Sequence, residues 1–181
     1  MGEAKRKKET VRAEYLTELA KWAFPPTEWE VVTVEEIKRL PVIKVDRASD
    51  RDLESMCMPP RKCHANARYR AENDPEGRSK QVTGWWLQDG NYVLHSIVNQ
   101  RGRYVCVTPA PLHPENPFHF IPDPKIEWRE VGDYREAYRG GVQIGPGIRS
   151  NPSQAIAEIN VMRQRLLSGM NPHKAFQRNA P

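Results

Sequence analysis

Long apolar runs are absent from this sequence of 181 residues, and cysteine is scarce. No stretch approaches the roughly 18 consecutive apolar residues of a membrane-spanning helix. The first ten residues, MGEAKRKKET, are mostly charged and no apolar segment follows them, so we expect neither a secretory signal nor membrane association. Three cysteines at irregular spacing exclude a disulfide-rich scaffold and favour a reducing compartment, for which we take the cytoplasm. Five tryptophans and six tyrosines argue against disorder throughout the chain.

The positive charge is concentrated at the two ends of the chain. The formal net charge is +5, and the first twelve residues alone carry five basic side chains. These ends are either solvated helix surfaces or weak contacts for nucleic acid or another polyanion. No aromatic-interleaved RNA-binding motif favours the second interpretation.

Both ends of the chain are predicted to be helical arms. Apolar side chains recur at helical spacing from Val11 to Trp22, and Pro25 and Pro26 end that helix. A second helix is predicted to begin at Asn151-Pro152, with proline in the first helical position, and to end at Gly169.

The middle of the chain predicts a helix followed by an antiparallel meander. The helix is expected over residues 62–73. Three strands are expected over 81–87, 92–98 and 103–108, joined by short hairpin connections. Trp29 to Val34 also has the pattern of a strand, and a capping box at Thr33 predicts a short helix behind it. A helix start is further possible at Ser49, and the proline-rich segment 109–124 is expected to be an ordered but irregular wrap.

These elements predict an α+β fold, with one helix packed on a three- or four-stranded antiparallel meander and with helical arms at both ends. The expected organisation is a basic N-terminal helix over 1–26, a core domain over 27–139, and a glycine-rich hinge with a C-terminal helix over 140–181.

Cys63 is the first candidate for chemistry, because it stands at the start of the central predicted helix. A thiol there faces the positive end of the helix dipole and free backbone N–H groups, which favour a thiolate. The same N–H groups could hold the oxyanion of an acyl intermediate. His64 is excluded as its base, since adjacent side chains on a helix diverge.

The strands supply a histidine. A turn at Asp89-Gly90 places His95 opposite Gly84, and a turn at Gln100-Arg101 places it opposite Cys106. The face that carries His95 is where we expect the Cys63 helix. Two further residues of this face have expected roles: Gly84 leaves room for a substrate chain and Trp86 forms a wall.

This order of residues resembles the papain-like and transglutaminase-like superfamily of cysteine enzymes. The resemblance covers about residues 55–110 and rests on a cysteine that opens a helix, a histidine on a following strand and a polar residue on the next strand. It implies Cys63 as nucleophile, His95 as general base and Cys106 as the orienting third residue, aided by Thr108. Asp or Asn usually fills the third position, so a Cys–His dyad or an inactive copy are both open. Asn66 is a further polar candidate near the substrate.

Three functions follow from these patterns. The leading one is a cysteine-dependent hydrolase or transferase that acts on an acyl or amide bond of a protein or peptide and needs no cofactor or metal. The second is a non-enzymatic binding or assembly protein that docks to a polyanionic or nucleoprotein partner through its basic terminal helices. The third is a zinc protein, although no pair of the available ligands has zinc-finger spacing. Those ligands would be Cys57, Cys63, His64, His95, Cys106, His113 and His119.

Overall fold

The computed structural model describes residues 3–88, 90–109, 115–145 and 147–177. The contacts divide the chain into two compact units, one formed by residues 1–32 with 151–181 and the other by residues 33–150. The two terminal segments that the sequence predicts as separate helical arms therefore belong to the same unit. In the described part of the chain, no helix has the length and apolar character to cross a membrane.

The first unit is helical. Its main helices are α1 (Glu3–Trp22), α5 (Pro152–Leu167) and α6 (Pro172–Ala175). They bury an apolar cluster of Leu19, Ile159, Leu166 and Ala175. The predicted ends of α5 are confirmed: Asn151 caps it by accepting a hydrogen bond from the backbone of Gln154, and Gly169 follows it with a φ of +90°.

The segment from Trp29 to Val34 is not the predicted strand, because it lies in α2 (Glu28–Ile37). The hydroxyl of Thr27 accepts a hydrogen bond from the backbone N–H of Glu30, which satisfies a free donor of the first turn. Glu28 and Glu30 also place negative charge at the positive end of the helix. These local interactions outweigh the strand preference of the valines.

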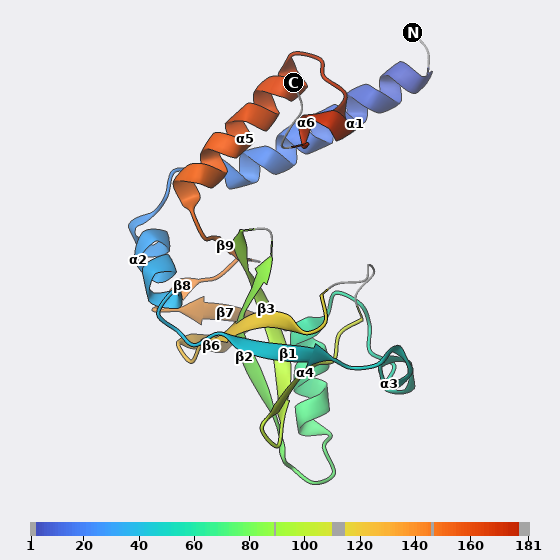
Figure 1. Ribbon diagram of the computed structural model, residues 1–181, viewed down its shortest axis with the longest axis vertical. Coiled ribbons are helices and arrows are strands. Elements are labelled where there is room, and N and C mark those ends of the chain that lie inside the picture. Colours follow the sequence, from blue (N-terminus) through green and yellow to red (C-terminus); the bar gives the residue numbers. More distant parts are fainter. Residues whose placement is uncertain (1–2, 89, 110–114, 146, 178–181) are drawn as a thin grey trace. The chain divides into compact units, whose positions relative to one another are not determined.

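The second unit is built around a closed barrel of five strands (Figure 1). The barrel strands are β1 (Ile43–Arg47), β2 (Ser79–Gln88), β3 (Asn91–Gln100), β4 (Arg103–Cys106) and β5 (Phe118–Pro122). Their order is β2-β5-β1-β4-β3, and β3 pairs again with β2 to close the ring. The short strand β9 (Gly147–Arg149) extends the sheet beside β3. A separate sheet contains β6 (Ile126–Val131), β7 (Tyr134–Arg139) and β8 (Val142–Gln143).

The predicted α+β class and the meander β2-β3-β4 are confirmed, but the meander is only part of the barrel. Two strands were not expected: β1 pairs with β4 in parallel, and β5 pairs antiparallel with both β1 and β2. The strand β5 lies in the proline-rich segment 109–124, for which we expected an irregular wrap. Residues 110–114 of that segment, which include His113, lie outside the described residues.

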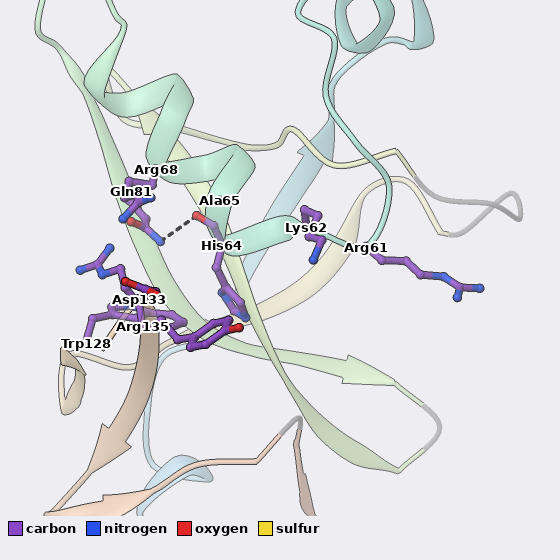
Figure 2. Close-up of a pocket in the computed structure, with 10 residues that line it drawn as sticks. Arg61, Lys62, His64, Ala65, Arg68, Gln81, Trp128, Asp133 and Arg135 are labelled. Atoms are coloured by element: carbon purple, nitrogen blue, oxygen red, sulfur yellow. Dashed lines mark hydrogen bonds between the residues drawn. The ribbon is translucent and has the colours of Figure 1, made fainter. Parts of the chain in front are cut away.

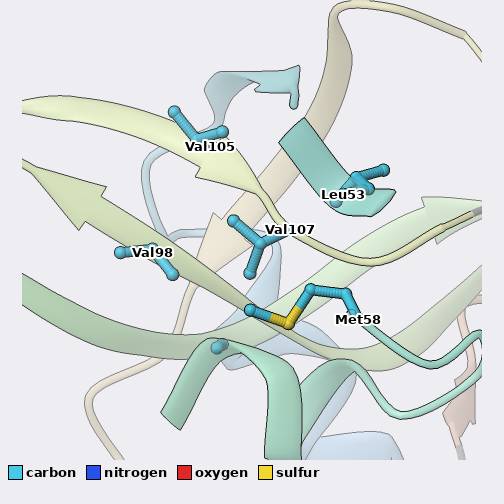
Figure 3. Packing of buried hydrophobic residues seen from close by; sticks show 6 residues of the cluster. Leu53, Met58, Val98, Val105 and Val107 are labelled. Carbon is cyan, nitrogen blue, oxygen red and sulfur yellow. The ribbon is translucent and has the colours of Figure 1, made fainter. Parts of the chain in front are cut away.

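The central helix α4 (Cys63–Glu72) packs on the outside of the barrel, which corrects its expected position on the His95 face. The interior is filled by the barrel's own side chains, chiefly Val45, Ile97, Cys106, Phe118 and Phe120. A five-stranded barrel has no room for a helix inside. Together with α3 (Asp50–Ser55), which begins after the predicted cap Ser49, α4 covers the opposite face (Figure 3). The buried residues of that outer cluster are Leu53, Met58, Ala67, Val98, Val105 and Val107.

The register of the meander is confirmed at its first hairpin and shifted at its second. Gly84 pairs with His95 as expected. Asn99, however, pairs with Tyr104 and not with Gly102, because Arg101 and Gly102 form the turn and both have positive φ. A two-residue hairpin turn of this kind matches the twist of the strands. The shift is by two residues, so Cys106 stays on the same face as His95.

A buried ion pair ties the β6–β7 hairpin to the barrel. The Nε atom of Arg139 donates to Asp123 Oδ2 over 2.8 Å, and the Trp85 indole donates to the same oxygen over 2.8 Å. Arg139 also pairs with Glu36 of α2 at 2.7 Å, which together with Lys125 keeps the pKa of Glu36 below its ordinary value. The hairpin is therefore held by charged groups that are satisfied on several sides.

Candidate functional site

Cys63 is the first residue of α4, as the sequence predicts. The preceding Lys62 makes no side-chain hydrogen bond to the end of the helix, and Arg61 holds a left-handed backbone with a φ of +61°. The half-buried thiol lies beside backbone N–H groups of Ser96, His64 and Cys63 itself, each of which lowers its pKa. Burial has the larger effect and raises the pKa of Cys63 above its ordinary value. The resting thiol is therefore protonated at neutral pH.

His95 is buried inside the barrel. Its Nε2 atom lies 3.3 Å from the sulfur of Cys106, and its ring packs against Trp86, Phe118 and Phe120. Burial lowers the pKa of His95 to about 3, so the ring is neutral. Among the described residues, its hydrogen-bond partner is Cys106, and no hydrogen bond joins it to Cys63.

The structure thus brings His95 and Cys106 together and places Cys63 near Cys106. The charge of Cys106 is close enough to raise the pKa of Cys63, although less than burial does. Burial also raises the pKa of Cys106, against an opposing effect of the Thr108 backbone N–H. The side chain of Thr108 accepts a hydrogen bond from Asn66 over 3.3 Å, and Asn66 also donates to the carbonyl of Pro59 over 2.9 Å. Asn66 is buried, and its side chain connects α4 to the chain segment that precedes the helix.

Gly84 and Trp86 do not form the expected substrate channel. A Cβ atom on Gly84 would lie 2.1 Å from the carbonyl oxygen of Ile121, so the space beside this glycine is filled by β5. Trp86 packs on Phe118 and His95 in the barrel interior. Both residues are explained by the close packing of a small closed barrel.

A second polar cluster lies on the outer face of the barrel, between α4 and β6. The Nδ1 atom of His64 is 2.8 Å from the hydroxyl of Ser96, whose other hydrogen-bond neighbours are Gln81 and Thr83. The indole of Trp128 donates to Thr83 over 3.0 Å, and its ring lies 4.8 Å from that of His64. Burial lowers the pKa of His64 to about 4, so this ring is also neutral at pH 7.

Three residues of this cluster, His64, Gln81 and Trp128, line an open cavity of about 470 Å³ (Figure 2). Its lining combines the start of α4 with Gln81 of β2 and the tip of the β6–β7 hairpin. The lining residues are Arg61, Lys62, His64, Ala65, Arg68, Gln81, Trp128, Asp133, Tyr134 and Arg135. A more apolar cavity of about 570 Å³ is lined by Thr83 and shares Gln81 and Trp128 with the first. Volumes of this size suit small ligands.

Sequence reasoning did not find this cavity, although one signal was present. Gln81, Thr83 and Ser96 are polar residues on the otherwise apolar strand face that α4 covers. A polar side chain on a strand face that a helix covers needs hydrogen-bond partners within the protein. The hairpin residues that complete the cavity, such as Trp128 and Arg135, are distant in sequence and carry no such signal.

Comparisons with known proteins give no match: no family model fits the chain, and neither the curated proteins nor the solved structures contain a significant relative. Within the described ranges, no three His, Cys, Asp or Glu side chains come together as a metal site would require.

Proposed function

We propose that this protein is a cysteine-dependent enzyme that acts on an acyl or amide bond, with Cys63 as the nucleophile. The observation that carries the proposal is that backbone N–H groups of Ser96, His64 and Cys63 act on the Cys63 sulfur at the start of α4 and lower its pKa against the larger effect of burial. Donors fixed in the backbone can stabilise a thiolate and the oxyanion of a tetrahedral intermediate without reorganising.

The reaction proceeds through a thioester. The Cys63 thiol loses its proton to a base, its sulfur bonds to the carbonyl carbon, and the bond from that carbon to the leaving group breaks while the leaving group takes the proton. Water or an amine then attacks the thioester and restores the thiol. Hydrolysis and transfer differ only in this last nucleophile.

His95 is the base in this proposal and Cys106 is the residue that orients it. In the tautomer in which Nε2–H donates to the Cys106 sulfur, the lone pair that accepts a proton is on Nδ1. The depressed pKa keeps the His95 imidazole unprotonated, with a free lone pair at neutral pH, but makes it a weak base, so the proton it takes is readily returned to the leaving group.

The test is acylation of Cys63 by p-nitrophenyl esters, followed by intact-mass measurement and peptide mapping. The exposed Cys57 is first replaced by serine, so that its ordinary thiol does not react. We expect a thioester on Cys63 that forms faster in the folded protein than in urea, is absent from Cys63→Ala, and forms about a hundredfold more slowly in His95→Gln.

Two results would contradict the proposal: acylation of the unfolded chain at the same rate or faster, or a His95→Gln protein that folds normally and reacts like its parent. Because His95 is buried, Cys106→Ser serves as a second variant; it keeps a hydrogen-bonding group at Nε2 and is expected to retain most of the rate.

The alternative function, docking to a polyanion through the basic arms at the ends of the chain, has less support than the enzymatic function. Arg12 donates to the backbone carbonyls of Gly169 and Met170, and Arg165 donates to those of Ala175 and Gln177. These guanidinium groups hold the helical unit together, so part of the terminal charge has a structural role.

A further inference from the structure

We infer that the cavity between the start of α4 and the β6–β7 hairpin binds the anionic group, carboxylate or phosphate, of a small ligand. This inference is independent of whether Cys63 is a nucleophile. It rests on the charge of the walls, on a hydrogen-bond donor of His64 that faces the cavity, and on the size of the cavity.

The walls are positively charged. Lys62, Arg68 and Arg135 line the cavity against the single carboxylate of Asp133, while Arg61 extends away from the other labelled side chains (Figure 2). Within the described residues, Lys62 has no ion-pair partner, and the nearest carboxylate to Arg68 is that of Glu72 at 4.0 Å, in an exposed pair that binds weakly. Cations that surround a concave site raise the local concentration of anions.

Two contacts hold the side chain of Arg135 in place. Its Nε atom pairs with Glu130 on the adjacent strand at 2.8 Å, and its guanidinium lies 5.6 Å from the centre of the Trp128 ring. This arrangement leaves the terminal nitrogens of the guanidinium to bind an oxyanion. The His64 ring also packs on Trp128, with the two ring centres 4.8 Å apart and the planes tilted by 59°.

The hydrogen-bond network around His64 favours one tautomer of its ring. The indole nitrogen of Trp128 and the amide nitrogen of Gln81 can only donate, so the oxygens of Thr83 and Ser96 accept from them. The Thr83 hydroxyl then has one acceptor left, Ser96.

The Ser96 hydroxyl in turn donates to Nδ1 of His64. In the reverse direction the Thr83 hydroxyl would have to donate to solvent in the adjoining cavity that it lines, whereas donation by Ser96 satisfies these groups within the protein.

Nε2 of His64 therefore carries the hydrogen. No hydrogen bond joins that Nε2–H to any residue in the described part of the chain, and His64 lines the cavity. A neutral N–H donor beside three cations suits the oxygens of a carboxylate or phosphate. Asp133 at the same wall would repel a long polyanion and could accept a hydrogen bond from a hydroxyl or amine next to the anion. These features favour a small ligand over a nucleic acid.

The test is titration calorimetry of the whole protein at low ionic strength with two separate probes, inorganic pyrophosphate and glutarate. We expect saturable binding of at least one probe. If only pyrophosphate binds, the ligand is a phosphate, and if only glutarate binds, it is a carboxylate. Arg135→Gln and Lys62→Gln should each weaken the binding by about tenfold.

Arg129→Gln is the matched control, because Arg129 lies on the same hairpin but packs over Tyr138 and does not line the cavity. It should leave the affinity unchanged, and so should Cys63→Ala, which separates this inference from the proposed catalysis. The ¹⁵N shifts of the His64 ring should show an Nε2–H tautomer and should move during titration. The inference is overturned if neither probe binds, if Arg129→Gln weakens binding as much as Arg135→Gln, or if His64 carries its hydrogen on Nδ1.

Discussion

At the scale of single residues, burial controls the chemistry of this protein more than charge does. The two histidines with depressed pKa values, His64 and His95, are neutral chiefly because the protein removes them from water. The pKa values of Cys63 and Cys106 are raised for the same reason. The neutral histidines therefore act as hydrogen-bonding groups, and each binds a partner that the fold supplies, Ser96 for His64 and Cys106 for His95.

This burial predicts instability in mild acid. The ordinary pKa of histidine is 6.5, whereas the folded protein holds that of His64 at about 4. The unfolded chain binds more protons between these values, so the stabilising effect is complete above pH 6.5 and is lost as the pH falls toward 4. The loss amounts to about 3 kcal/mol for His64 at the end of that window.

Urea denaturation between pH 7 and pH 4 measures this loss. The His64→Gln protein should lose less stability over the same range, by about the amount assigned to His64. An equal pH dependence of both proteins would show that His64 does not titrate as described.

At the scale of elements, the close approach of β5 to β2 decides how the barrel closes. Gly84 pairs with Pro122, and the carbonyl of Ile121 fills the position where a side chain would begin. A glycine in a strand is often a sign of such an approach. The same packing directs Phe118 and Phe120 into the interior, where they surround His95.

Gly84→Ala should therefore disrupt the closure of the barrel. The added Cβ must displace backbone and not a flexible side chain, so we expect a loss of about 3 kcal/mol or more in the free energy of unfolding. Gly145→Ala is the control, because nothing lies within 4 Å of the corresponding Cβ position and its φ is not in the left-handed region. Denaturation midpoints that change equally in the two variants would contradict this account.

At the scale of the whole molecule, the chain forms two compact units, and its two ends build one of them together. The helical unit has a small core of its own around Leu166, which is fully buried, whereas its neighbour Leu167 is 62% exposed. The barrel unit holds both the Cys63 region and the cavity.

Leu166→Ala should loosen the helical unit selectively. Removing this side chain costs about 2–5 kcal/mol in a packed core. Hydrogen exchange followed by mass spectrometry should show faster exchange in α1, α5 and α6, with the barrel strands unchanged. Leu167→Ala should leave all regions unchanged, and an increase in exchange that spreads to β2 and β3 would show that the two units unfold as one.

Local patterns in the chain were enough to predict several of its elements. Capping residues, turns and strand alternation located α4, α5 and the β2–β3–β4 meander, and they placed Cys63 at a helix start and His95 on one face with Cys106, because these signals act over a few residues.

The side of the strands that α4 covers depends on long-range pairing and could not be predicted from local patterns. The barrel closes through β1 and β5, whose pairing partners are far away in the chain and have no local signature. Because the barrel closes, side chains fill the face that carries His95, and α4 packs on the outside. There His64 lines a cavity together with Trp128 and Arg135.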